Sequence, residues 1–109
     1  MARIPRKPPA ELVDRWPDEA AADISVEVAR ALSLRLRKEM HGRSAREVGR
    51  VTKVDHSTVQ AILRGTTWPD LMTIARLEAG LGADLWPAGV ATAGMPSRLP
   101  QEGPSSTVG

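Results

Sequence analysis

Side chains that can hydrogen-bond to the edges of nucleic-acid bases lie between residues 56 and 64, in the run HSTVQAILR. At roughly 100° per residue, the apolar Val59, Ile62 and Leu63 share one face of a helix. The residues on the outer side are Ser57, Ala61 and Arg64, with His56 in the first turn and Gln60 at the flank. Such a face suits the major groove of DNA, which is about 12 Å wide. Many helices carry a polar face for solubility alone, so the neighbouring elements decide its meaning.

Two capped helices joined by a short turn would position this face. Ser44 and Glu47 form an S-x-x-E capping box, which begins one helix, and we expect that helix to end near Thr52. After a turn of about three residues, Asp55 caps the next helix, and Gly65 ends it in the left-handed conformation. The pattern predicts a helix-turn-helix arrangement.

Two further helices would cover the apolar sides of this pair. The longer one is predicted at about Ser25 to His41, and a later one begins after the Asp70 cap and ends at Gly82. Their repeating apolar residues are Ile24, Val28, Leu32, Leu36 and Met40 in the first, and Leu71, Ile74, Leu77 and Leu81 in the second. The following ADLWP run, residues 83–87, is expected to tuck Leu85 and Trp86 against the bundle.

Composition and charge favour an intracellular protein that binds a polyanion. The chain has 109 residues and no Cys, and it shows neither a membrane-length apolar run nor the hydrophobic region of a signal peptide. Residues 30–64 contain nine bases and three acids, a net +6, whereas the whole chain carries +2 and the remainder therefore −4. The sequence thus predicts a cytoplasmic, nucleoid-associated protein with a positive field around the two central helices.

The two ends of the chain differ from its centre. Residues 1–17 are basic and rich in Pro, and we expect a mostly flexible arm with at most a short helical turn near its end. Residues 18–87, with a core at 24–87, would form the folded domain, in which Trp68 covers the open end of the core. Residues 88–109 are rich in Gly, Pro and Ser, which predicts a disordered tail. Whether the arm touches DNA stays open.

The order of these elements resembles the helix-turn-helix domain of phage repressors, Cro proteins and the XRE group of bacterial regulators. The resemblance is carried by SAREVG, VDHSTVQAILRG and WPDLMTIARLEAGLG, and the wording is similar to actinobacterial and actinophage members. It implies an all-α fold, a compact four- to five-helix bundle of the phage-repressor (lambda repressor-like) type with flexible N- and C-terminal tails. In that family Gly49 would be the small residue where the two motif helices cross. The buried motif positions would be Val48, Val54, Val59 and Ile62.

Three positions depart from the family pattern. Lys53 stands where the turn is usually Gly, so it must accept a left-handed conformation or a differently shaped turn. Leu63 replaces a common acidic residue, which makes a buried ion pair unnecessary because apolar packing can take its place. Arg43 stands where an apolar residue is common, which leaves the join between the first two helices open.

Transferred residue by residue, the resemblance implies two sets of DNA contacts. The base-edge positions would be His56, Ser57, Gln60, Ala61 and Arg64. The alternative for Arg64 is a contact with the DNA backbone. The phosphate contacts would be Ser44, Ala45, Arg46, Arg43, Arg50, Lys53, Thr58, Thr66 and Thr67. No metal, cofactor or catalytic residue is expected.

These features predict a sequence-specific regulator of transcription, a repressor or an activator, that binds double-stranded DNA as a homodimer on a palindromic site. One alternative is the antitoxin of a toxin–antitoxin pair, whose C-terminal tail would fold on the toxin. Another is a helical protein-interaction module that has lost DNA binding. An enzyme is disfavoured because His41 and His56 lie apart and no HExxH pair, phosphate-binding loop or nucleophile elbow occurs. With three Trp and no Phe or Tyr, stacking platforms for single strands are also missing.

Overall fold

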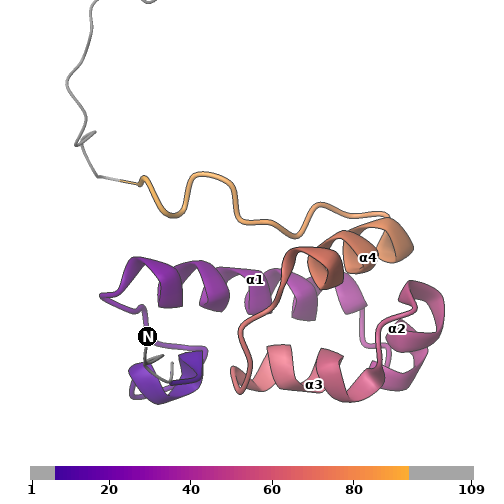
Figure 1. The fold of residues 1–109 in the computed structure, drawn as a ribbon, viewed down its shortest axis with the longest axis horizontal. Helices are drawn as coiled ribbons and strands as arrows, with labels where there is room; N and C mark the ends of the chain where they lie inside the picture. Colours follow the sequence, from indigo (N-terminus) through magenta and orange to yellow (C-terminus); the bar gives the residue numbers. More distant parts are fainter. Residues whose placement is uncertain (1–6, 94–109) are drawn as a thin grey trace, which may run out of the picture.

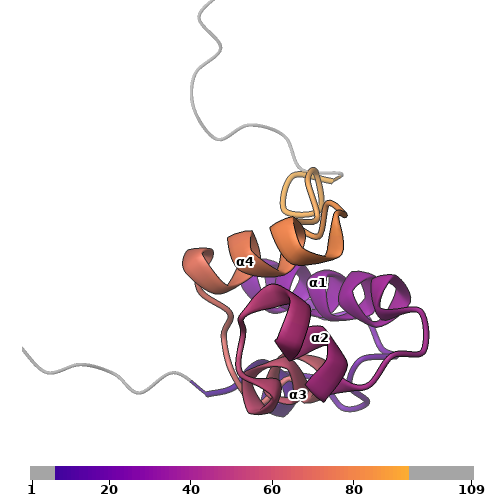
Figure 2. The same cartoon turned by 90° about the vertical axis from the view of Figure 1, so that its right-hand side faces the viewer.

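Four α-helices and one short 3-10 helix make up the described part of the chain, residues 7–93 of a computed structural model. The elements in chain order are η1 (Pro9–Leu12), α1 (Ile24–Met40), α2 (Ala45–Thr52), α3 (His56–Arg64) and α4 (Leu71–Leu81). Helices α1 and α4 lie on one side of the bundle, α3 lies along the other, and α2 closes one end (Figures 1 and 2). Residues 7–93 contain no strand, which confirms the predicted all-α bundle.

Each α-helix begins at a side chain that accepts a backbone N–H and ends at a residue in the left-handed conformation. The N-terminal caps are Asp23, Ser44, Asp55 and Asp70, and the C-terminal residues are His41, Lys53, Gly65 and Gly82. These caps satisfy backbone groups that have no partner within the helix, so they fix the boundaries. The helix predicted at Ser25 to His41 is shifted by a single residue.

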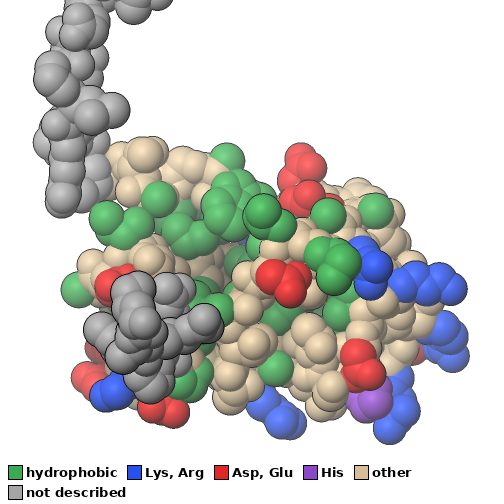
Figure 3. Space-filling model, viewed as in Figure 1, with side chains coloured by type: hydrophobic (Ala, Val, Ile, Leu, Met, Phe, Trp, Pro, Cys, Tyr) green, Lys and Arg blue, Asp and Glu red, His purple; other side chains and the backbone are tan. Residues whose placement is uncertain are grey.

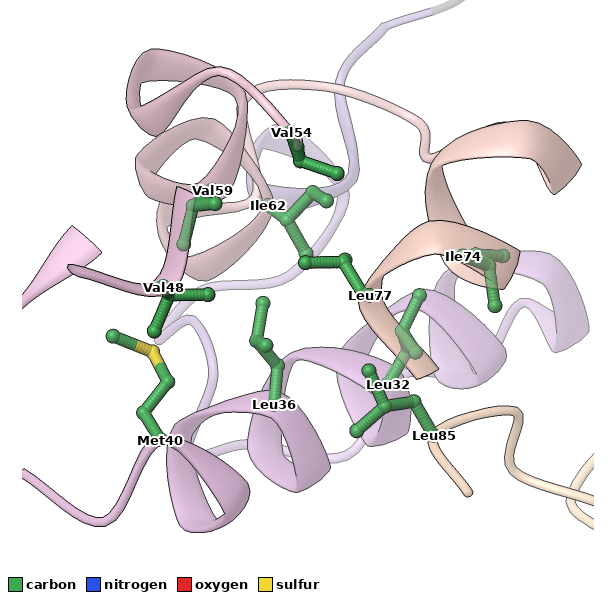
Figure 4. Close-up of a cluster of buried hydrophobic side chains, with 10 residues drawn as sticks. All are labelled: Leu32, Leu36, Met40, Val48, Val54, Val59, Ile62, Ile74, Leu77 and Leu85. Carbon is green, nitrogen blue, oxygen red and sulfur yellow. The ribbon is translucent and has the colours of Figure 1, made fainter. Parts of the chain in front are cut away.

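Ten buried side chains form one core between the helices (Figure 4). They come from all four helices, from the α2–α3 turn and from the chain after α4: Leu32, Leu36, Met40, Val48, Val54, Val59, Ile62, Ile74, Leu77 and Leu85. Burial of a Leu, Ile or Val side chain contributes roughly 1.5–3 kcal/mol, so this cluster is the main stabilising feature. All four predicted motif positions are buried in it, and Leu63 packs against its edge.

Four apolar residues that the sequence places against the core do not enter it, and one of them, Val28, is half-buried at a surface groove. Ile24 is 44% exposed and Leu71 is 79% exposed, because each is the first residue of its helix and lies beyond the end of the packed surface. In the ADLWP run Leu85 is fully buried, whereas Trp86 is 49% exposed. The apolar spacing therefore predicts the packed face of α1 and α4 but not where packing stops.

The N-terminal segment, residues 7–17, packs against the bundle instead of forming part of a mostly flexible arm. Pro9 and Pro17 are buried, and the indole Nε1 of Trp16 donates a hydrogen bond to the carbonyl oxygen of Leu63 at 2.9 Å. The sequence signals flexibility here because four prolines and few apolar residues precede Asp18. Residues 1–6 and 94–109 lie outside the described residues, so the predictions for those parts of the arm and tail stay predictions.

No helix within residues 7–93 has the length and apolar character needed to cross a membrane.

Candidate nucleic-acid interface

Helix α3 turns one side to the core and the other to solvent. Val59 and Ile62 are buried on the inner side. On the outer side Ser57, Gln60 and Arg64 are exposed. The half-buried His56 and Ala61 lie beside them, so the structure brings the five predicted base-contact positions onto a single nine-residue helix.

The first turn of α3 is fixed by Asp55. Its Oδ1 accepts the backbone N–H of Ser57 at 2.8 Å and the Ser57 hydroxyl at 2.6 Å. The hydroxyl bond, followed by the backbone bond, lowers the pKa of Asp55 below its ordinary value of 3.8. Because the Ser57 proton is committed to this cap, the side chain presents acceptor lone pairs to its surroundings. His56 lies nearby, with its Nδ1 3.8 Å from Asp55 Oδ1.

The turn between α2 and α3 is a tight corner. Lys53 adopts the left-handed conformation at φ 64°, and its N–H donates to the carbonyl oxygen of Gly49 at 2.9 Å. A Cβ added at Gly49 would lie 2.6 Å from the carbonyl oxygen of Val54, so only Gly allows this approach. The buried hydroxyl of Thr52 donates to the Val48 carbonyl at 2.7 Å and accepts the Val54 N–H at 3.3 Å. The family resemblance implies this role for Gly49, whereas the sequence indicates Thr52 only as a helix end.

The N-terminus of α2 carries the predicted capping box. The Ser44 hydroxyl accepts the Glu47 N–H at 3.1 Å, and Glu47 Oε1 accepts the Ser44 N–H at 2.8 Å. The latter bond is the first cause of the lowered pKa of Glu47. Since the Ser44 N–H is engaged, the amides that remain for an external anion are those of Ala45 and Arg46.

Three of the nine bases in residues 30–64 serve internal contacts. Arg30 pairs with Glu27 at 2.7 Å, and Arg35 donates to the carbonyl of Asp84 at 3.3 Å. Arg43, in the loop between α1 and α2, donates through Nε to the Met40 carbonyl at 3.0 Å, so it caps the C-terminal end of α1. The sequence assigned Arg43 to phosphate without this role.

Other bases remain exposed beside α3. Among the described residues, no salt bridge is formed by Arg46, Arg50, Lys53 or Arg64. Basic side chains gather at the end of the molecule formed by α2 (Figure 3). An open hollow between α2 and α3 is lined by Arg46, Gly49, Arg50, Val54, Asp55 and His56.

The loop after α3 holds the remaining predicted phosphate contacts. Thr66 is exposed, and its N–H donates to the Ala61 carbonyl at 2.9 Å. Its hydroxyl makes a longer bond of 3.4 Å to the same oxygen. Thr58 and Thr67 are half-buried. Of these three threonines, Thr66 is therefore the one that is exposed.

The C-terminal end of α3 is held by residues that the sequence did not single out. Trp16 and the buried Ser33 both donate to the Leu63 carbonyl, at 2.9 and 3.2 Å. The N–H of Ala10 donates to the Gly65 carbonyl at 2.8 Å. The partners in these contacts are separated by between 30 and 55 residues in the sequence, so no local pattern indicates them.

Residues 34–85 match a family model described as Helix-turn-helix. The match includes the C-terminal part of α1, then α2, the corner, α3, α4 and Leu85, so over these elements the chain is similar to helix-turn-helix proteins. No curated protein and no solved structure gave a match. A helix-turn-helix unit has two helices joined by a short turn, and α2 and α3 correspond in order to these two helices.

Proposed function

We propose that this protein is a sequence-specific, double-stranded-DNA-binding regulator of transcription that places α3 in the major groove of an operator. The proposal rests on the contrast between the buried inner side and the exposed outer side of α3. Its inner side is anchored by Val59 and Ile62, and its outer side presents Ser57, Gln60 and Arg64 to solvent. An anchored helix with an exposed hydrogen-bonding face is what direct reading of base edges requires.

The proposed base contacts are His56, Ser57, Gln60, Ala61 and Arg64. Gln60 offers both a donor and an acceptor, which suits adenine, and Arg64 offers a fork of donors, which suits guanine. Ala61 would meet a thymine methyl group. Ser57, whose proton is committed to Asp55, would accept a hydrogen bond from a base amino group.

The proposed phosphate contacts surround this helix. They are Ser44, Ala45, Arg46, Arg43, Arg50, Lys53, Thr58, Thr66 and Thr67. The amides of Ala45 and Arg46 at the start of α2 support this set, as do the exposed bases that form no salt bridge with residues 7–93. Arg43 would meet a phosphate in addition to its bonds with α1.

One recognition helix reads only a few base pairs, so we propose a homodimer on a palindromic site. Half-site centres would lie about one helical turn apart, roughly 34–36 Å. The protein would act in the cytoplasm, associated with the nucleoid, as a repressor or an activator.

Selection of bound sequences from random duplex DNA, at two salt concentrations, tests this function. A symmetric enriched motif is the expected result, and it would establish both base reading and dimeric binding. The matched control is Arg64→Ala. This variant should still bind duplex DNA but should enrich the motif less than the wild type does. Absence of any enriched sequence at either salt concentration would contradict the proposal and favour a protein-interaction module.

A further inference from the structure

We propose that Trp16 is a positioning residue for the recognition helix, and that residues 7–17 are part of the DNA-reading unit. This inference rests on the proposed function. It extends that unit beyond residues 34–85, the range of the family match. The N-terminal segment (residues 7–17) would set the C-terminal turn of α3, and with it the base-reading Arg64.

The N-terminal segment is fixed to the bundle at both of its ends. Near its start the carbonyl of Lys7 accepts the indole N–H of Trp68 at 2.9 Å. At its end the carbonyl of Pro17 accepts Nη1 of Arg30 at 2.9 Å, and Arg30 is itself held by Glu27. Between these points, η1 packs on α1. The indole of Trp16 is therefore presented to α3 from a supported backbone.

The last turn of α3 needs donors from outside the helix. The carbonyls at a helix C-terminus have no partner in the regular ladder. Here the Ala61 and Ile62 carbonyls are satisfied by the amides of Thr66 and Gly65, at 2.9 and 3.2 Å. Within residues 7–93, the donors to the Leu63 carbonyl are the Trp16 and Ser33 side chains. Both donors precede residue 34.

The indole also forms a wall against the turn that follows α3. A Cβ added at Gly65 would lie 2.5 Å from Cε2 of Trp16 and 2.9 Å from the Cβ of Ala10. Gly65 is buried there at φ 72°. The turn is thus held by two outside bonds to the Leu63 carbonyl, by one bond to the Gly65 carbonyl, and by close packing of Trp16 and Ala10 on Gly65.

These contacts give the two ends of α3 different supports. The N-terminal end is set by Gly49 and the α2–α3 corner, which lie within the matched range. The C-terminal end, which carries Arg64, is set by Trp16 and Ser33, which lie outside it. A base-reading side chain must be held within about 0.5 Å of its productive position, so loosening this end should weaken base reading.

The test compares Trp16→Phe with the wild type on the selected site and on a scrambled duplex. Phenylalanine keeps an aromatic ring but removes the N–H donor. We expect binding to the selected site to weaken about 5-fold, in the range of one lost hydrogen bond, and binding to the scrambled duplex to change less than about 2-fold. Trp86→Phe makes the same exchange at a half-exposed indole beyond α4 and should change neither.

A double-mutant cycle with Arg64→Ala separates positioning from general structure. If Trp16 acts through Arg64, Trp16→Phe should change selected-site binding less than about 2-fold once Arg64 is replaced. Equal losses in both backgrounds would overturn the inference. So would unchanged binding of Trp16→Phe to the selected site.

Amide hydrogen exchange of the free protein gives a readout that needs no DNA. Trp16→Phe should speed exchange at Gly65 and Thr66 while exchange in the centre of α1 stays as in the wild type. If Trp16→Phe loses helical circular dichroism, Ser33→Ala takes its place in both experiments, because it removes the second donor to the same carbonyl. Faster exchange without selective DNA binding by the wild type would contradict the proposed function and, with it, this role. Unchanged exchange would contradict the positioning alone.

Discussion

Gln60 and Arg64 are the exposed side chains of α3 with the strongest base-reading chemistry. Both can form two hydrogen bonds to one base, which the other proposed base contacts cannot do. Gln60→Ala and Arg64→Ala should each weaken binding to the selected site by about 1–3 kcal/mol, with a smaller effect on a scrambled duplex. Titrations of both duplexes at one salt concentration measure the difference. Equal losses on the two duplexes would contradict the base-reading assignment.

Asp55 links the stability of α3 to pH. Its pKa is lowered in the folded protein by the hydrogen bonds of Ser57, so the cap contributes stability above the ordinary value of 3.8. That contribution is lost as the pH falls through the lower folded value. Asp55→Asn keeps a capping side chain that does not titrate. We expect Asp55→Asn to match the stability of the wild type near pH 7. Below about pH 4 the thermal unfolding midpoint of the variant should fall less steeply with pH than that of the wild type.

Asp14→Asn is the control for this pH dependence. Asp14 is exposed and caps no helix, so its replacement should leave a decline parallel to that of the wild type. Glu47 and Asp70 also have lowered pKa values from capping bonds, and they keep part of the decline in every variant. A decline in Asp55→Asn as steep as in the wild type would contradict the role of the cap.

At the scale of elements, the crossing of α2 and α3 depends on Gly49. In an ordinary helix interior, replacement of Gly by Ala stabilises by about 0.5–1 kcal/mol. Here the added Cβ would meet the Val54 carbonyl at 2.6 Å, and a backbone atom can move only if the two helices separate. Gly49→Ala should therefore destabilise the protein by about 1–3 kcal/mol in urea unfolding followed by circular dichroism.

Ala75→Gly provides the reference for helix propensity in this chain. Ala75 is exposed on α4, so its replacement should cost about 1 kcal/mol through propensity alone. A stabilising effect of Gly49→Ala would mean that the helices do not approach as closely as the structure shows.

The sequence predicted the helices well because their boundaries are set by local chemistry. Asp55, Ser44 and Asp70 cap helices through bonds to residues two or three positions away, and such spacings can be read directly. The bond from Trp16 to Leu63 spans 47 residues and has no local signal. Nearby prolines predict flexibility for the N-terminal segment, whereas in the fold Pro9 and Pro17 are buried.

The candidate site shows the same division. The outward face of α3 follows from helical spacing, and Gly49 follows from its position in the motif. The internal hydrogen bonds of the Ser57 hydroxyl, the Arg43 guanidinium and the Ser44 amide do not follow from this spacing, because they depend on which partners the fold brings into reach. Whether the predicted residues contact DNA stays a prediction.

At the scale of the whole molecule, the two sides have different surfaces. The side formed by α2 and α3 carries exposed bases that form no salt bridge with described residues, including Arg46, Arg50 and Lys53. Away from α3, a groove of about 330 Å³ is lined mainly by apolar side chains of α1, α4, Trp68 and Trp86, and Figure 3 shows hydrophobic side chains gathered there. Electrostatic attraction to DNA would therefore orient the molecule before any base is read.

This orientation predicts how salt should act on binding. Each phosphate neutralised by the protein contributes about −0.9 to the slope of log K against log salt concentration. Arg50→Ala and Lys53→Ala should each reduce the steepness by about 1 per bound chain and weaken selected and scrambled duplexes alike. Arg35→Ala removes the same charge, but this guanidinium donates to the Asp84 carbonyl in the chain after α4 and is not among the proposed DNA contacts, so the slope should stay unchanged. Equal slopes for all three variants would show that net charge, and not the α2–α3 surface, attracts the DNA.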